Sequence, residues 1–202
     1  MFQHIAEGLD DEMCERVFNL NKDGLQRKIS RTFFNYVLCT YDKRILDQCR
    51  ENFLSKPTLE AFELFLSLVF YIGKGRKARS LSHIDEVRKT YTGALSKKTE
   101  KTSKILDAFK NNDGIIIIQC FDSANEDEAF NREAVMIEGK GLENLCNAIH
   151  GHKIGINDWN DFTSRNYGML LLYKAFLRYI GEGTKPIKLN EILYRAAKSK
   201  SF

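Results

Sequence analysis

The chain lacks the features that mark membrane, secreted and low-complexity proteins. Its longest apolar stretches, around residues 62–73 and 114–120, are too short and too interrupted to cross a bilayer. No leader with a cleavage site opens the sequence, and no internal repeat or low-complexity tract is visible. We therefore expect a soluble intracellular protein, in the nucleus or the cytoplasm, that does not bind membranes.

Cysteine and proline are scarce, with five cysteines and two prolines in 202 residues. The cysteines are odd in number and scattered, and several lie in apolar runs, which is typical of buried thiols in a reducing compartment. We expect no disulfide bonds. A hydrophobic fraction of 43%, with 14 Phe and 8 Tyr, predicts a well-packed core rather than a disordered chain.

Positive charge is concentrated in one part of the chain. From Lys74 to Lys104 there are ten Lys or Arg against three acids, a local charge of +7, whereas the whole chain carries +4. A cationic face on a nearly neutral body is typical of a protein that binds a polyanion. The alternative is a solvated lysine-rich helix. We favour that interpretation for four lysines when they are considered by themselves: Lys97, Lys98, Lys101 and Lys104.

The pattern of apolar residues predicts a small sheet with interleaved helices, an α/β sandwich. Strands are expected at residues 32–41, at 66–72, and at 115–120, where the isoleucine run predicts a buried central strand. Helices are expected at residues 5–29, 42–53, 58–65, 80–91, 98–111, 126–138, 168–180 and 189–197. Asn125 has the position of an N-cap, and Gly139 and Gly141 are expected to end the helix that it begins.

The segment that follows the second strand combines a tyrosine, glycines and cations, and we expect a tight glycine turn there, where strand meets helix. Its members are Tyr71, Gly73, Lys74, Gly75, Arg76, Lys77, Arg79 and His83. Phenols exchange protons with water, and a nearby cation would lower the pKa of a phenol toward use as a base. Arg79 and His83, four residues apart on one helix face, offer a fork for a phosphate oxygen and a proton relay. This set suits the binding and cleavage of a phosphodiester.

Two residues distant in sequence complete the set. Tyr36, on the first strand, can place its phenol at the same sheet edge as Tyr71, and Glu133 can hold a divalent cation such as Mg²⁺, which keeps most of its waters. Each residue also has a structural interpretation. The tyrosines can be core aromatics, Arg79 a surface cation, and Glu133 a helix ion pair with Arg132.

At these residues the chain resembles the GIY-YIG endonucleases. Phe34-Asn35-Tyr36 stands at the first tripeptide of that family and keeps only its tyrosine, whereas Tyr71-Ile72-Gly73 matches the second in full. The remaining matches are the family's arginine and histidine at Arg79 and His83, its metal-binding glutamate at Glu133, and its closing asparagine at Asn147. The likeness is strongest to an animal branch in which the nuclease domain is joined to ankyrin repeats and a LEM domain, and it spans about residues 33–193.

The resemblance implies a mainly antiparallel three-stranded sheet and a metal-dependent endonuclease that uses Mg²⁺ or Mn²⁺. By resemblance, Tyr36 is the general base or positions the water, Tyr71 and Arg79 hold the scissile phosphate, and His83 assists proton movement. Asn147 and the basic segment are expected to bind substrate: Gly73, Lys74, Gly75, Arg76 and Lys77. No base-reading element is visible, so we expect selection of branched DNA, such as flaps and Holliday junctions, in DNA repair or chromosome processing. A homodimer would match the two equivalent strands of a junction.

The implied organisation has three parts. Residues 1–31 form a helical arm, residues 32–150 form the nuclease core with a helical insertion at 42–66, and residues 151–202 form a helical extension packed on the core.

Other interpretations remain open. The chain can be a catalytically inactive DNA-binding module of the same fold, or an interaction scaffold whose tail, residues 167–179, forms a partner groove. A zinc site at Cys146, His150 and His152 is not favoured because no fourth ligand is evident. An ATPase is not favoured because the Gly-x₄-Gly-Lys-Ser/Thr pattern is missing.

Overall fold

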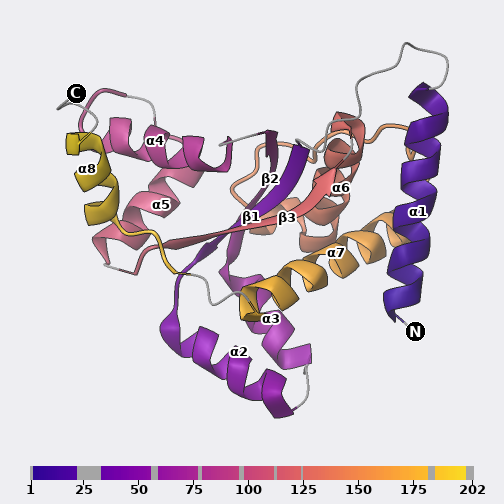
Figure 1. The fold of residues 1–202 in the computed structure, drawn as a ribbon, viewed down its shortest axis with the longest axis horizontal. Coiled ribbons are helices and arrows are strands. Elements are labelled where there is room, and N and C mark those ends of the chain that lie inside the picture. Colours follow the sequence, from indigo (N-terminus) through magenta and orange to yellow (C-terminus); the bar gives the residue numbers. More distant parts are fainter. Residues whose placement is uncertain are drawn as a thin grey trace.

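The computed structural model describes residues 2–21, 33–55, 59–76, 79–95, 98–111, 113–123, 125–181 and 185–198. Figure 1 shows the elements in chain order: α1 (Phe2–Asn21), β1 (Phe33–Thr40), α2 (Lys43–Ser55), α3 (Leu59–Leu68), β2 (Val69–Arg76), α4 (Arg79–Tyr91), α5 (Glu100–Lys110), β3 (Ile115–Ser123), α6 (Glu126–Lys140), a 3₁₀ turn η1 (Leu142–Asn144), α7 (Asp161–Gly181) and α8 (Leu189–Lys198).

The three strands form one antiparallel sheet in the order β2-β1-β3, which confirms the predicted fold class. On β1, Tyr36 lies opposite Gly73 and Leu38 lies opposite Tyr71. Because alternate residues of a strand point to the same side, Tyr36 and Tyr71 share one face of the sheet.

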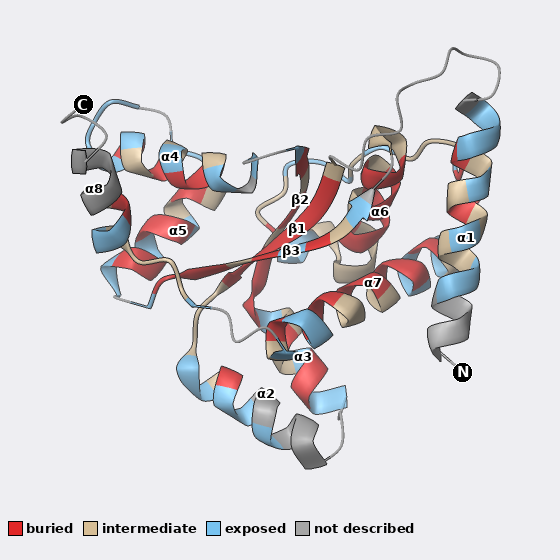
Figure 2. Cartoon of the chain, in the orientation of Figure 1, coloured by how far each residue is buried: buried red, intermediate tan, exposed pale blue. Residues whose placement is uncertain are grey.

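Helices cover both faces of the sheet (Figure 1). One layer, with α4, α5 and α8, packs on Phe34, Tyr36 and Leu38. The opposite layer, with α3, α6 and α7, packs on Val37 and Cys39, and α1 packs on α6 and α7. Figure 2 shows the result, buried strands between helices whose outer faces are exposed.

The isoleucine run forms β3, but β3 is an edge strand, so the prediction of a central strand is wrong. Helices on both sides explain the sequence. Ile115 and Ile117 pack in the α4–α5 layer, whereas Ile116 and Ile118 are buried in the α6–α7 layer. A strand covered on both faces is apolar throughout, whatever its place in the sheet.

The expected glycine turn is also absent, because β2 continues through Gly73 and Gly75 to Arg76. Residues 66–68, predicted as strand, complete α3 instead. A Cβ on Gly73 would lie 2.5 Å from the Tyr36 Cζ atom and hydroxyl oxygen. Gly73 is therefore required by the close approach of the Tyr36 ring, not by a turn.

The α6 helix begins as predicted, with the Asn125 side chain accepting a hydrogen bond from the Glu128 N–H at 3.0 Å. It ends at Gly141, whose φ of 84° is the left-handed conformation that glycine favours. Gly139, predicted to end the helix with Gly141, lies inside it and faces the α7 backbone. Gly168 on α7 lies against the Val135 carbonyl, where no side chain fits.

The tail helix α7 begins at Asp161, earlier than predicted, and its aromatic side chains from Tyr167 to Tyr179 belong to the core or pack against it. Tyr167 and Tyr179 are fully buried, so they do not form the open partner groove considered above. At the other end, α1 is one helix to Asn21, and the rest of the segment predicted as helix, residues 22–29, lies outside the described residues. None of the helices in the described ranges combines the length and apolar character needed to span a membrane.

Candidate active site

The outer edge of β2 is closed by side chains and by one short segment. The Phe70 carbonyl accepts from the Cys146 N–H at 2.7 Å. The Asn147 side chain accepts from the Ile72 N–H at 3.1 Å and donates to the Ile72 carbonyl at 2.8 Å. Asn147, expected to bind substrate, thus uses its amide to hold β2 in place.

The next group along the same edge is Glu133. Its Oε1 atom accepts from the Lys74 N–H at 3.1 Å, which brings the α6 carboxylate to the sheet. Burial raises the pKa of Glu133 to about 6, and the Lys74 charge and N–H only partly oppose that rise. The surrounding groups therefore compensate only part of the negative charge of the ionised Glu133 carboxylate.

Two phenols and an imidazole form a buried cluster on the α4 side of the sheet. The Tyr36 hydroxyl lies 2.6 Å from His83 Nε2, and both residues are 1% exposed. The half-buried Tyr71 ring adjoins both, with its centroid 6.2 Å from that of Tyr36 and 5.2 Å from that of His83. Three of the predicted catalytic residues therefore converge in space although 47 residues separate Tyr36 from His83.

His83 has a further partner that sequence analysis missed. Lys101 Nζ lies 2.8 Å from His83 Nδ1, and the same ammonium lies 3.4 Å from a Glu86 carboxylate oxygen and 4.8 Å from the Tyr71 ring centroid. Burial and the Lys101 charge lower the pKa of His83 to about 4. His83 is neutral at physiological pH.

A nearby cation does lower the phenol pKa, as expected, but the net shift of both phenols is upward. Burial raises the pKa of both Tyr36 and Tyr71 above the usual value. Arg79 lowers both, but its effect is smaller than that of burial. A phenolate at Tyr36 therefore requires more stabilisation than Arg79 supplies.

Arg79 begins α4 and is exposed. A Cβ on Gly75 would lie 2.5 Å from the Arg79 Cβ, so this glycine makes room for the arginine. Because the Arg79 charge acts on the pKa of Tyr36, Tyr71 and His83, its guanidinium belongs to the same electrostatic environment.

The other predicted cations are placed differently. Lys74 Nζ lies 2.9 Å from a Glu126 oxygen and 3.6 Å above the Phe130 ring, so it is held against α6. Arg76 is exposed and lies over the Phe33 ring at 4.8 Å. Lys77 lies outside the described residues.

An open cleft of about 450 Å³ lies beside this edge of the sheet. Its lining comes from β2, α5, α6 and the segment after η1: Tyr71, Thr99, Lys101, Phe130, Glu133, Ile137 and residues 146–149, 151 and 152. The half-buried phenol of Tyr71 and the carboxylate of Glu133 thus face one solvent-accessible hollow.

Within the described ranges, no three His, Cys, Asp or Glu side chains converge to hold a metal ion. Cys146 and His152 line the cleft, whereas the zinc site considered above also needs His150, which does not line it. Glu133 is the carboxylate that the cleft offers to a cation.

The signal for Lys101 was present in the sequence. Lys101 precedes Ile105 by four residues and Ala108 by seven, and both are buried on α5. A lysine on the apolar stripe of a helix faces the core rather than solvent. Its side chain is accordingly 13% exposed.

Comparison with known proteins agrees with this geometry. Residues 33–193 match the family model of the LEM-3-like GIY-YIG domain. The chain is 30% identical over 168 residues to mouse (Mus musculus) ankyrin repeat and LEM domain-containing protein 1, covering 83% of this chain and 31% of that protein. It is 32% identical over 171 residues to the Caenorhabditis elegans homologue, covering 82% of this chain and 23% of that protein.

The chain thus spans less than a third of the curated relatives that it matches. No solved structure gives a significant match. The family match covers the sheet, the cleft and every predicted site residue, and the chain belongs to the GIY-YIG family, in its LEM-3-like branch.

Proposed function

We propose that this chain is a metal-dependent endonuclease that hydrolyses phosphodiester bonds of DNA. The family supports a nuclease. The observation that carries the proposal is the convergence of Tyr71, Glu133 and the buried Tyr36–His83 pair beside one cleft. Binding alone would require neither an undercompensated carboxylate nor a buried phenol in contact with an imidazole.

Glu133 suits a hard divalent cation such as Mg²⁺ or Mn²⁺. Its carboxylate oxygens are hard donors, and its raised pKa reports a negative charge that burial leaves poorly compensated. When bound there, such a cation would offset negative charge on the phosphate and the leaving oxygen.

The protein groups then have distinct roles. Tyr36 is the proposed proton acceptor for the attacking water, because its buried oxygen contacts the His83 imidazole and its ring adjoins that of Tyr71, which lines the cleft. Tyr71, on the cleft wall, and Arg79, whose charge acts on Tyr71, are proposed to donate hydrogen bonds to the scissile phosphate. Water attacks in line in a single step and leaves 5′-phosphate and 3′-hydroxyl ends.

Substrate choice is proposed to follow DNA shape. Two exposed cations near the cleft would bind phosphates on either side of the cut, without reading bases: Lys98, next to the lining residue Thr99, and Lys104 on α5, whose charge acts on the lining residue Cys146. We propose that branched DNA is preferred and that two copies act on a four-way junction.

The test is cleavage of linear, nicked, flapped and four-way DNA with and without Mg²⁺, by the wild-type chain and by Glu133→Gln. The matched control is Glu143→Gln, which removes an exposed carboxylate on η1. We expect Mg²⁺-dependent cutting by the wild type and the control, and DNA binding without cutting by Glu133→Gln. Retardation of DNA by the wild type with no cleavage would indicate an inactive binding module. Cutting by Glu133→Gln would refute the metal assignment.

A further inference from the structure

Tyr36, His83 and Lys101 form a continuous line of polar contacts beneath the cleft. The Tyr36 oxygen lies 2.6 Å from His83 Nε2, and His83 Nδ1 lies 2.8 Å from Lys101 Nζ. The three side chains come from β1, α4 and α5. The line therefore connects a buried phenol, across the imidazole, to a lysine on the cleft wall.

The hydrogen-bonding capacity of Lys101 determines which ring nitrogen of His83 carries the proton. A lysine ammonium has three N–H donors and no lone pair, so His83 Nδ1 must accept its hydrogen bond. A neutral imidazole with an accepting Nδ1 carries its proton on Nε2. His83 must then donate from Nε2 to the Tyr36 oxygen.

Glu86 does not alter this assignment. Its carboxylate oxygen lies 3.7 Å from His83 Nδ1, which is too long for a hydrogen bond, whereas Lys101 Nζ lies at 2.8 Å. Burial lowers the pKa of Lys101, and the same Glu86 carboxylate, 3.4 Å from Lys101 Nζ, opposes that shift and favours the charged ammonium. The other groups that act on His83 are Arg79, which opposes an imidazolium, and the Tyr71 ring.

We propose that Lys101 is a positioning residue for the nuclease reaction, which holds His83 as the Nε2–H tautomer so that His83 donates a hydrogen bond to the Tyr36 oxygen. This inference rests on the proposed function. It gives His83 a role different from the proton relay expected from the sequence, because an Nε2 that already carries a proton cannot accept one from Tyr36.

The assignment supplies what a phenolate at Tyr36 needs. Burial opposes the negative charge, and the His83 N–H is a donor aimed at the oxygen that carries it. The phenolate takes one proton from the attacking water and becomes Tyr36 O–H, while the hydroxide bonds to phosphorus and the P–O3′ bond breaks. The leaving 3′-oxygen takes a proton from solvent water to become the 3′-hydroxyl, and Tyr36 returns its proton to solvent after the cut. His83 keeps its Nε2 proton throughout.

The decisive measurement is the tautomer of His83 in the folded protein without DNA. Two-bond ¹H–¹⁵N NMR spectra of ¹⁵N-histidine-labelled protein distinguish Nε2–H from Nδ1–H, and the loss of one ring system in His83→Gln assigns the signal among the four histidines. We expect Nε2–H at pH 7 in the wild type. An Nδ1–H tautomer in the wild type would overturn the proposal whether or not any variant folds.

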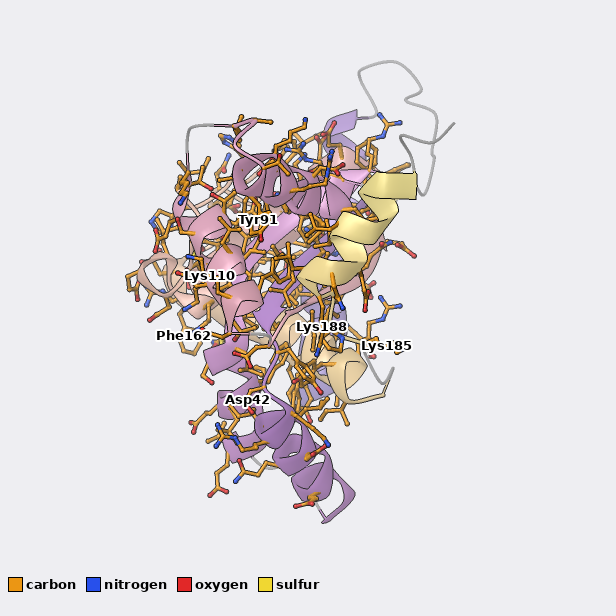
Figure 3. The ribbon with its side chains drawn as sticks, turned by 90° about the vertical axis from the view of Figure 1, so that its left-hand side faces the viewer. Asp42, Tyr91, Lys110, Phe162, Lys185 and Lys188 are labelled. Carbon is orange, nitrogen blue, oxygen red and sulfur yellow. The ribbon has the colours of Figure 1, made fainter. Side chains whose placement is uncertain are left out.

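Two substitutions test the contribution of Lys101. Lys101→Met keeps the length of the side chain but removes the donor, whereas Lys101→Arg keeps a donor. The matched control is Lys110→Met, on the same helix. The Lys110 side chain is 67% exposed, and the residue is labelled in Figure 3. We expect mixed tautomers in Lys101→Met, and the wild-type tautomer in Lys101→Arg and in the control.

On cleavable DNA, Lys101→Met should lower kcat roughly 10- to 100-fold with little change in KM, and Lys101→Arg should restore part of the loss. A fall in DNA affinity with kcat unchanged would make Lys101 a phosphate-binding cation and overturn the proposal. If the NMR assignment holds but the wild-type chain cuts no DNA, the proposed function fails while the hydrogen-bond assignment stands.

Discussion

Two consecutive charged residues of α6, Arg132 and Glu133, lie in contrasting environments. Arg132 binds both carboxylate oxygens of Asp10 on α1, at 3.0 and 3.1 Å, and Tyr167 on α7 donates to the same carboxylate. Glu133 accepts one hydrogen bond from the Lys74 backbone and lines an open cleft. We call the first set the closed network and the second the open site.

The pKa values of Asp10 and Glu133 shift in opposite directions. Burial alone would raise the pKa of Asp10, but the hydrogen bonds and charge of Arg132 lower it below its usual value. The pKa of Glu133 is raised to about 6 by burial because Lys74 compensates it only in part. A buried charge with matched partners joins three helices, whereas a buried charge left short of partners is available to a ligand.

The largest predicted effect comes from breaking the closed network. Asp10→Ala leaves the Arg132 guanidinium buried without its bidentate partner, so we expect the free energy of unfolding to fall by about 3–5 kcal/mol. Urea denaturation measures this loss. The control is Asp11→Ala, the exposed neighbour on α1, which should change stability by less than about 0.5 kcal/mol. Equal losses in both variants would show that the network does not tie α1 to the core.

The next effect concerns His83 and pH. Its pKa is about 4 in the fold against 6.5 in the unfolded chain, so the unfolded chain binds more protons between these values. Stability contributed by neutral His83 is present above pH 6.5 and is lost as pH falls through 4, by up to about 3 kcal/mol. The free energy of unfolding, measured at several pH values across this window, should depend more steeply on pH in the wild type than in His83→Gln. Parallel curves would contradict the burial of a neutral imidazole here.

The smallest effect has the opposite sign. Glu133→Gln removes a carboxylate whose pKa is raised, so at pH 7 the metal-free variant should be more stable than the wild type by about 1 kcal/mol. Thermal unfolding without divalent cations measures the gain, with Glu143→Gln as the neutral control. A loss of stability in Glu133→Gln would place Glu133 with the closed network rather than the open site.

Much of the fold followed from local patterns. The strands near Tyr36 and at the isoleucine run were predicted because β-branched and aromatic residues are dense there, and the start of α6 followed from Asn125. The order of the strands did not follow, because burial on both faces is compatible with an edge as well as a centre. The continuation of β2 through Gly73 and Gly75 was missed because these glycines serve contacts with residues of other elements, Gly73 with Tyr36 and Gly75 with Arg79.

Sequence analysis placed in the candidate site those residues whose side-chain type and motif position point to a function. It missed roles that depend on contacts between residues far apart in the sequence. Tyr71 and Glu133 line the cleft as the motif implies, whereas the backbone-holding amide of Asn147 is visible only in three dimensions. Lys101 was grouped with solvated lysines, and only its spacing from Ile105 pointed inward. Asp10 gave no signal at all, since its partner Arg132 lies 122 residues away.

The contact between Gly168 and the Val135 carbonyl has a consequence for evolution and engineering at the cleft. Because α6 and α7 meet backbone to backbone there, no repacking of side chains can shift one helix along the other to adjust the reach of the Glu133 carboxylate. Changes in the shape of the cleft are thus left to lining residues that hold neither β2 nor His83, such as Ala148, Ile149 and His152, while the Glu133 carboxylate keeps its place.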